Sequence, residues 1–192
     1  MTSTSDSHAA PARTVLDACA VLSLYATSRM EEIIATVPGT VAIAEMVLQE
    51  ALYVRRIVDG VSEPEVVDLR PMVASGALTV IDTDDEEELQ TFVNLAVDLD
   101  DGEAMTAALA IHRSYVLVTD DRKAERLLAG RVQLRATLEL VKAWADAEQI
   151  DAPTLRAVLT SIYERGYQPP NRHALKSWWE TILIGGTDAT KG

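Results

Sequence analysis

Short runs of β-branched and aliphatic residues alternate along this chain with longer segments whose apolar residues recur at helical spacing. The strand-like runs are RTVL at 13–16, TVAIA at 40–44, ALTVID at 77–82, YVLVT at 115–119 and RVQLRAT at 131–137. Strands that alternate with helices form βα units, in which the strands lie parallel in one sheet and helices cover both faces. The sequence therefore predicts an α/β protein, a three-layer α/β/α sandwich with a mostly parallel central sheet.

Two of the expected helices have features that bear on the candidate site. After TVAIA, apolar residues continue at helical spacing, which predicts one helix with Glu50 in its early turns. The apolar residues of this helix are Val47, Leu48, Ala51, Leu52 and Val54. The segment Thr83-Asp-Asp-Glu86 has the spacing of a capping box, so another helix is expected to begin there.

Charge and cysteine content exclude several classes of protein. The 192 residues include 30 acidic and 17 basic side chains, for a net charge of −13. Proteins that hold duplex DNA by phosphate neutralisation need many Lys and Arg, so this class is excluded. One cysteine, no secretory leader and no apolar run near roughly 18 residues predict a cytoplasmic protein that does not associate with membranes.

The sequence lacks the motifs of several enzyme classes but places acids where a parallel sheet would gather them. It has no phosphate-binding loop, dinucleotide glycine motif, nucleophile elbow or paired zinc ligands. Asp17, Asp120 and Asp121 follow predicted strands, and Glu50 and Glu103 lie near helix starts. Since ligands bind outside the carboxyl ends of such strands, these acids are expected to converge. Carboxylate oxygens favour Mg²⁺ or Mn²⁺, and a metal-held water beside a phosphate suits phosphodiester hydrolysis.

Four segments together resemble the acidic motifs of PIN-domain nucleases. They are LDACAVLSLY, the spaced Glu50, LDDGEAMTAALA and LVTDDRKAERL. The resemblance covers roughly residues 13–150, and more loosely extends to 170. It implies a metal-dependent ribonuclease, and the LDDGEA form of the third motif suggests a variant branch of the VapC-like toxins.

The resemblance assigns roles to particular residues. The expected catalytic acids, one from each motif, are Asp17, Glu50, Glu103 and Asp121. The expected metal ligands are Asp17, Glu103 and Asp121, with Asp101 and Asp120 as alternatives and Asp100 close enough to assist. Thr119 would orient the fourth acid. Cys19 departs from the family, which commonly has Ser, Thr or Asn there, and Glu45 competes with Glu50 for the second position.

The resemblance also implies partners. RNA would be the substrate, and a cognate antitoxin would hold such a toxin inactive, as in type II toxin–antitoxin pairs. Related folds often pair, so a homodimer is expected as well. Arg122, Lys123 and Arg126 follow the last acidic motif and could meet RNA phosphates, or could form a solvated helix face.

Simpler roles remain open for the same residues. Asp17 and the Asp120/Asp121 pair could be helix caps, and Cys19 is interpreted as a small buried side chain rather than a nucleophile. Two other functions also fit: a catalytically degenerate PIN fold that binds RNA or protein, and an aspartyl phosphotransfer enzyme. The second of these is disfavoured because position 19, two residues after Asp17, is a cysteine and no Asp-x-Asp follows the first strand.

The chain is expected to divide into four segments. These are a disordered lead-in at 1–12, a PIN-like nuclease domain at 13–150, a helical extension at 151–185 and a flexible tail at 186–192. Within the extension, Trp178 and Trp179 are expected to clamp the last helix to the domain, with base stacking as the alternative.

Overall fold

A computed structural model of the chain describes residues 13–50, 52–58 and 61–184. The expected disordered lead-in at 1–12 and the tail at 186–192 lie outside these residues. The described part contains a five-stranded sheet in the order β5-β2-β1-β6-β7. Its strands are β1 (Arg13–Leu16), β2 (Thr40–Ala44), β5 (Thr79–Ile81), β6 (Val116–Val118) and β7 (Gln133–Arg135). Every neighbouring pair in this sheet is parallel, as the alternation of strands and helices predicts.

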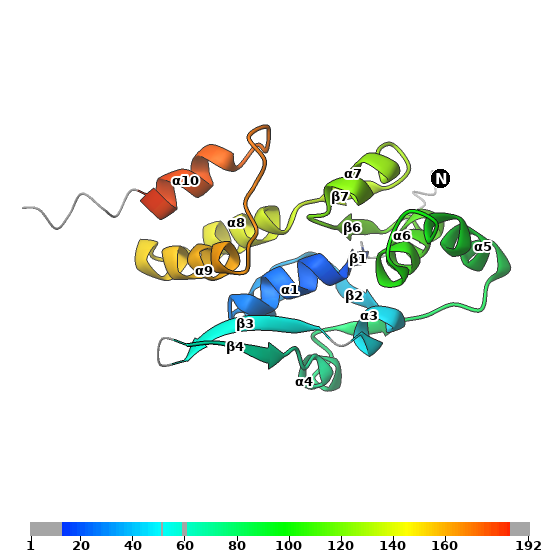
Figure 1. Ribbon diagram of the computed structural model, residues 1–192, viewed down its shortest axis with the longest axis horizontal. Coiled ribbons are helices and arrows are strands. Elements are labelled where there is room, and N and C mark those ends of the chain that lie inside the picture. The colour runs from blue at the N-terminus through cyan, green and yellow to red at the C-terminus, as the bar shows by residue number, and fades with distance from the viewer. Residues whose placement is uncertain (1–12, 51, 59–60, 185–192) are drawn as a thin grey trace, which may run out of the picture.

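Helices cover both faces of the sheet. They include α1 (Ala18–Ala26), α2 (Met30–Ala35), α3 (Glu45–Gln49), α5 (Glu86–Leu95), α6 (Asp101–Arg113), α7 (Arg122–Leu128), α8 (Thr137–Ala147) and α9 (Ala152–Glu164). Helices α5 and α6 lie on one side of the sheet, and α1, α8 and α9 lie on the other (Figure 1). The three-layer α/β/α sandwich expected from the sequence is therefore confirmed.

The Ala-rich helix α6 packs closely against the sheet because its side chains are small. It contacts β1, β2 and β6, and Ala104, Ala107, Ala108 and Ala110 are fully buried. Its outer side packs on α5, where Arg113 of α6 donates two hydrogen bonds, of 2.7 and 2.6 Å, to the Glu88 carboxylate. This packing fixes the start of α6, which carries the third acidic motif, relative to the sheet.

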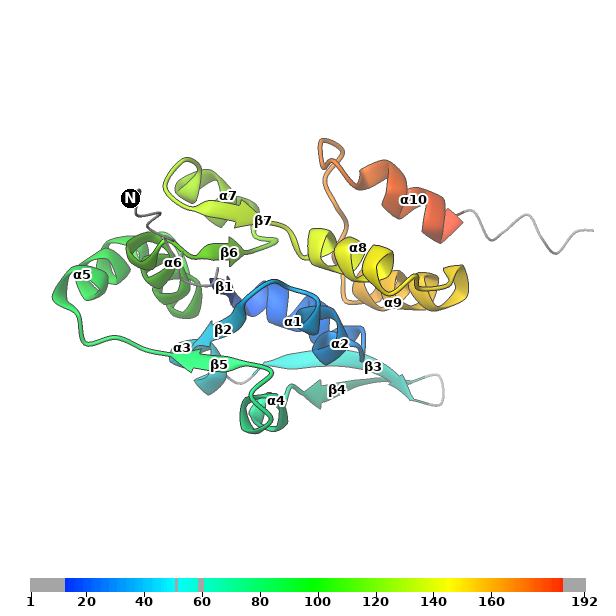
Figure 2. The ribbon, with the colours of Figure 1, turned by 180° about the vertical axis from the view of Figure 1, so that it is seen from behind.

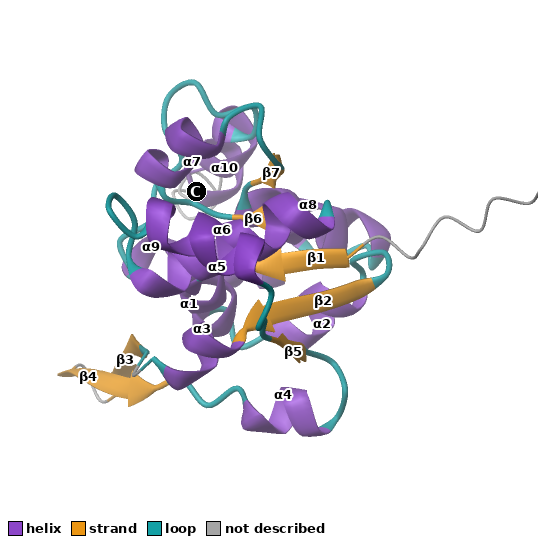
Figure 3. Cartoon of the chain, turned by 90° about the vertical axis from the view of Figure 1, so that its right-hand side faces the viewer, coloured by secondary structure: helices purple, strands orange, loops and turns teal. Residues whose placement is uncertain are grey.

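The helix expected to continue through residue 54 ends much earlier. Helix α3 ends at Gln49, and the chain then forms an antiparallel hairpin of β3 (Tyr53–Val58) and β4 (Val61–Val66). Figure 3 shows this hairpin projecting away from the main sheet. The β-branched and aromatic residues from Tyr53 onward favour a strand, and this preference outweighs the helical spacing of the preceding apolar residues.

The start of α5 also differs from the expected capping box. Asp85, rather than Thr83, caps the helix, and its Oδ1 accepts the Glu87 and Glu88 amides at 2.9 and 3.1 Å. Thr83 instead accepts the Asp85 amide at 2.9 Å, which orders the turn before the helix. The short helices α2 and α4 (Arg70–Ala74) have no counterpart among the elements expected from the sequence.

The C-terminal helices pack on the α1 side of the sheet (Figure 2). Helix α10 (Lys176–Ile184) contacts α9, and the buried Trp179 ring meets Tyr167 edge to face, with a centroid distance of 6.0 Å. Trp179 is buried as the clamping role expects, whereas Trp178 is only partly buried and lies under the Lys142 ammonium. Among the helices of the described residues, none is both long and apolar enough to cross a membrane.

Candidate functional site

Two adjacent strands deliver the first and fourth acidic motifs to one edge of the sheet. Strand β1 pairs with β6 in parallel, with Leu16 opposite Val118. The next residue after β1, Asp17, donates its amide to the Val118 carbonyl at 3.1 Å. From here the chain leads from β1 towards β2 and from β6 towards β7, in opposite directions along the sheet. Such a switch point is where α/β sheets bind ligands.

The Asp17 carboxylate is buried at this edge and only half satisfied. Its Oδ1 accepts the Ala20 amide at 2.7 Å and so caps α1, while its buried Oδ2 has no hydrogen bond of normal geometry, although the Thr119 hydroxyl is near enough to lower the pKa of this carboxylate. Burial raises the pKa of Asp17 to about 7; the charges of Asp120 and Glu103 add to the rise, and the Ala20 amide and Thr119 hydroxyl oppose it. A buried carboxylate oxygen without a donor needs a proton or a cation.

Asp121 keeps one oxygen available at the same edge. Its Oδ1 caps α7 by accepting the Lys123 and Ala124 amides, both at 2.7 Å. The Asp121 amide donates to the buried Thr119 hydroxyl at 3.1 Å, so Thr119 orients this residue through its backbone. The hydrogen bonds to described residues use Oδ1 alone, which leaves Oδ2 for another ligand.

Asp120 is engaged with two neighbouring helices. Its Oδ1 accepts the Thr137 amide at the start of α8 at 3.0 Å, and its Oδ2 lies 3.4 Å from the Ser23 hydroxyl of α1. Burial raises the pKa of Asp120, and the Thr137 hydroxyl and amide, the charge of Arg165 and the Ser23 hydroxyl oppose the rise. Of the two adjacent acids, Asp120 therefore joins secondary-structure elements, and Asp121 has more freedom to bind a ligand.

Glu103 lies among the other acids in the first turn of α6. It is half-buried, and burial raises its pKa, with Asp121, Asp100 and Glu50 adding to the rise. Since Glu103 also raises the pKa of Asp17, it connects the first and fourth motifs electrostatically. Asp100 and Asp101 are exposed at the start of the same helix.

Glu50 reaches the other acids from the end of α3 rather than from within a long helix. It is the C-cap residue of α3, with extended backbone, and this geometry turns the chain towards β3. Burial raises the pKa of Glu50, with contributions from Asp100 and Asp101, while the Gly102 amide opposes the rise. Glu45, the other candidate for the second acid, accepts a hydrogen bond from the Gln49 side chain of its own helix at 3.0 Å. Glu50 is therefore the better candidate.

The acids suit an oxygen-liganded divalent cation in their chemistry. The unpartnered Oδ2 of Asp17 and the raised pKa values of Asp17 and Glu103, which burial causes first and neighbouring carboxylates increase, fit a site whose charge a cation would neutralise. Within the described residues, no three His, Cys, Asp or Glu side chains are arranged to hold one ion together. Among the described residues, the acids therefore do not form a ready-made three-carboxylate site.

The basic residues of α7 differ in how free they are. Lys123 contacts Asp98, with its ammonium against the carbonyl oxygen and 3.6 Å from the carboxylate. Arg122 and Arg126 are exposed. Arg122 and Arg126 are thus better placed than Lys123 to meet an incoming anion.

Two side chains near the acids were not expected from the sequence. Ser23 of α1 and Arg165, which caps the C-terminus of α9, are hydrogen-bonded to each other beside Asp120. Cys19, which was expected to be a small buried side chain, is partly buried. Burial, followed by the charge of Asp17, raises the pKa of the Cys19 thiol to about 12, so it is not a thiolate nucleophile.

A sequence model described as a PIN domain matches residues 13–172. The chain belongs to the PIN-domain family. The match begins with β1 and continues beyond α9, so the family's domain includes the acidic edge and the helix that carries Arg165. PIN domains are generally nucleases that use divalent metals, which agrees with the kind of fold found here. A comparison with curated proteins finds no match.

Proposed function

We propose that this PIN domain is a metal-dependent endoribonuclease that hydrolyses RNA phosphodiester bonds with Mg²⁺ or Mn²⁺. The supporting observation is the buried Asp17 carboxylate, whose Oδ2 has no partner and whose charge is opposed by Glu103 and Asp120. Like-charged carboxylates repel one another more strongly where burial lowers the effective dielectric, so a bound cation would relieve this arrangement. Without a cation, the repulsion between carboxylates at this edge would lower the stability of the folded state.

Each residue would contribute to a different part of the reaction. Asp17, Glu103 and Asp121 would hold the cation, with Asp101 and Asp120 as neighbours. When bound, the cation would lower the pKa of a water and stabilise charge on the phosphate. Thr119 would keep Asp121 in place, and the exposed Arg122 and Arg126 would contact flanking phosphates. Glu50 would complete the acidic edge from the α3 side.

The test is cleavage of a labelled single-stranded RNA. The expected result is cutting with Mn²⁺ that is lost with EDTA and in the Asp17→Asn and Glu103→Gln variants. Asp85→Asn is the matched control, because Asp85 caps α5 as Asp17 caps α1 but lies outside the acidic edge. If Mn²⁺ neither binds nor supports cutting, the better hypothesis is a catalytically degenerate PIN fold that binds RNA or protein.

We also propose that the enzyme is the toxin of a type II toxin–antitoxin pair in the cytoplasm, with a cognate antitoxin and a homodimeric state. The VapC-like order of the motifs supports this assignment. An antitoxin that inserts a basic segment over the acids would block them directly, since the net charge is −13. Expression of the chain alone should arrest growth, and the Asp17→Asn variant should not. Equal growth in both cases would remove the toxin assignment but leave the nuclease proposal standing.

A further inference from the structure

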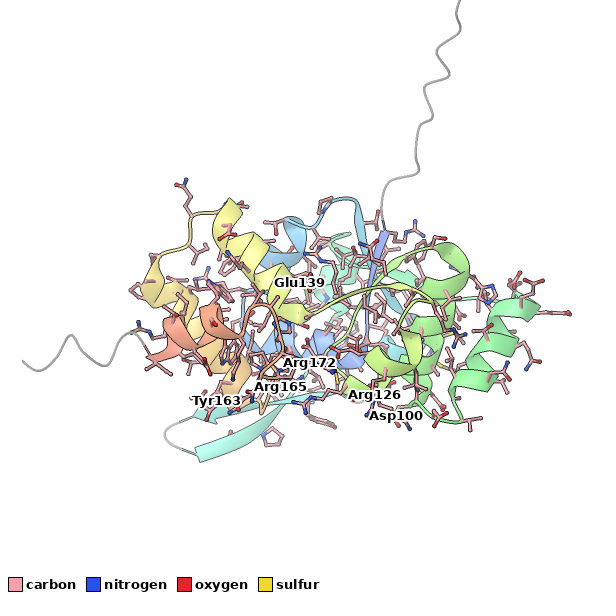
Figure 4. The ribbon with its side chains drawn as sticks, turned by 90° about the horizontal axis from the view of Figure 1, so that it is seen from above. Asp100, Arg126, Glu139, Tyr163, Arg165 and Arg172 are labelled. Carbon is pink, nitrogen blue, oxygen red and sulfur yellow. The ribbon has the colours of Figure 1, made fainter. Side chains whose placement is uncertain are left out.

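An arginine from the helix that follows the sheet reaches the acidic edge. Arg165, at the C-terminus of α9, lies next to α1 in Figure 4. Its Nη2 donates to the Cys19 carbonyl at 3.0 Å and to Ser23 Oγ at 2.8 Å, and its Nε donates to the same oxygen at 3.2 Å. The guanidinium is therefore hydrogen-bonded to the first two turns of α1, the helix that Asp17 caps.

These hydrogen bonds decide where the Ser23 proton points. A hydroxyl has one hydrogen and two lone pairs, and the two Arg165 donors occupy the lone pairs. A serine within a helix can otherwise donate to the carbonyl four residues earlier, which here is Cys19, but Arg165 and the helical amide of Ser23 already occupy the two lone pairs of that oxygen. The remaining partner of the fully buried Ser23 hydroxyl is Asp120 Oδ2, at 3.4 Å.

Charge reinforces this relay. Arg165 is the positively charged residue among the groups that act on Asp120 and on Cys19, and all the other charges acting on Cys19 are carboxylates. A guanidinium that polarises a hydroxyl towards a carboxylate strengthens that hydrogen bond in a buried setting. Asp120 is then held from two sides, by Ser23 on α1 and by the Thr137 amide on α8.

We propose that Arg165 is a positioning residue of the nuclease site: through Ser23 and the Cys19 carbonyl it fixes Asp120 and the first turn of α1, and so aligns the acids for metal and RNA. The inference rests on the proposed ribonuclease function and deepens it. It makes α9 part of the catalytic apparatus rather than an attached extension. Partners that orient metal-binding side chains typically change metal affinity or activity by about 10- to 100-fold when removed.

A second arginine of α9 provides a matched control. Arg156 donates its Nε to the Ile182 carbonyl at 2.9 Å and so ties α9 to α10, away from the acids. Arg156 and Arg165 both bridge α9 to another helix through a backbone carbonyl. If Arg165 only tethers helices, the two substitutions should have the same consequences.

The experiment compares Arg165→Met, Arg165→Lys, Ser23→Ala and Arg156→Met. We expect Arg165→Met to lower kcat for labelled RNA in Mn²⁺ by about 10- to 100-fold and to weaken Mn²⁺ binding in calorimetry, with KM changed less than kcat. Arg165→Lys should recover part of the loss. Ser23→Ala should lower kcat in the same direction, and the double variant should be less than additive because both residues act in one relay.

The outcomes separate this inference from the function on which it rests. Wild-type kcat in Arg165→Met, or losses in Arg165→Met and Arg156→Met that follow their melting temperatures alike, would overturn the positioning role. If the wild-type chain cuts no RNA in Mn²⁺, the proposed function fails. Calorimetry then still tests the positioning role. An unchanged Mn²⁺ affinity in Arg165→Met would contradict that role, and so would a wild-type chain that binds no Mn²⁺.

Discussion

The Glu50 carboxylate lies over the bare α-carbon of Gly102, at the start of α6. A Cβ built on Gly102 would collide with Glu50 Oε1 and come within 3.3 Å of a Val47 methyl group. The glycine therefore makes room for the second acid to reach the third motif. Gly102 is the glycine of LDDGEA. Its lack of a side chain is what allows Glu50 to lie against this motif.

Replacing Gly102 by Ala should separate stability from activity. The atom displaced is the end of a flexible side chain, and Ala favours a helix over Gly by about 1 kcal/mol. We expect a melting temperature equal to or above that of the wild type, together with slower RNA cleavage because Glu50 is pushed away from α6. Thermal unfolding and cleavage rates of Gly102→Ala and Glu50→Gln measure this. Full activity in Gly102→Ala would mean that RNA cleavage does not require the Glu50 carboxylate in its present position against α6.

Asp17 should make stability depend on pH in the metal-free protein. Its pKa is about 7 in the folded state and 3.8 for an ordinary Asp of the unfolded chain, so the folded state binds the proton more tightly. The favourable contribution is complete below pH 3.8 and is lost as the pH rises towards 7. Asp17→Asn should therefore be more stable than the wild type at pH 8 in EDTA, by at most about 4 kcal/mol.

Urea unfolding of both proteins between pH 4 and 8 measures this difference. The advantage of Asp17→Asn should shrink towards pH 4, and Mn²⁺ should stabilise the wild type more than the variant. Asp85→Asn removes the charge from an exposed helix cap and should show no such gain at pH 8. A lower stability of Asp17→Asn than of the wild type at pH 8 would contradict the burial of an unpartnered charge.

The alternation of strands and helices predicted most of the fold, and it predicted where the first and fourth acidic motifs lie. Asp17 and Asp121 could be placed because a residue that follows a parallel strand must lie at the sheet's carboxyl edge, whatever else the chain does. The pattern failed after Gln49, where apolar spacing suited a helix but the β-branched residues formed a hairpin. Part of a signal for that hairpin was present, since Asp59-Gly60 follows the β-rich run YVRRIV, but the Glu and Pro residues of VSEPEV after it do not favour a strand.

The relay from Arg165 to Ser23 could not be inferred in the same way. The two residues are 142 positions apart, and neither belongs to a motif with a required spacing. Their meeting depends on how α9 packs against α1, which follows from the shapes of buried side chains rather than from local sequence preference. Tertiary contacts of this kind are where sequence patterns stop being informative.

The pair of Arg113 and Glu88 should stabilise the α5–α6 contact more than an exposed pair does. Its two hydrogen bonds of 2.7 and 2.6 Å hold the pKa of Glu88 below its usual range, chiefly through the Arg113 hydrogen bonds. Glu88→Gln should cost about 1–3 kcal/mol of unfolding free energy at pH 7. The cost should shrink as the pH falls below 4.5, because the unfolded wild type takes up a proton there before folded Glu88 does.

The matched control is Glu32→Gln, which removes the partner of Arg29 in an exposed pair, where a single guanidinium nitrogen contacts both carboxylate oxygens at 2.8 and 3.0 Å. Exposed pairs typically contribute about 0–1 kcal/mol. Urea unfolding of both variants at pH 7 and pH 4 provides the comparison. Equal losses in the two variants would show that burial between α5 and α6 adds nothing to this ion pair.

The two adjacent tryptophans of α10 should behave differently when each is replaced by Ala. Trp179 is 3% exposed and meets the Tyr167 ring edge to face, so its loss leaves a cavity and should cost about 3–5 kcal/mol. Trp178 is partly buried, with the Lys142 ammonium 5.6 Å from its ring, and should cost about 1 kcal/mol. If either ring stacked on RNA bases instead, its replacement would raise KM at unchanged stability, so denaturation and cleavage kinetics measured on both variants distinguish clamping from base recognition.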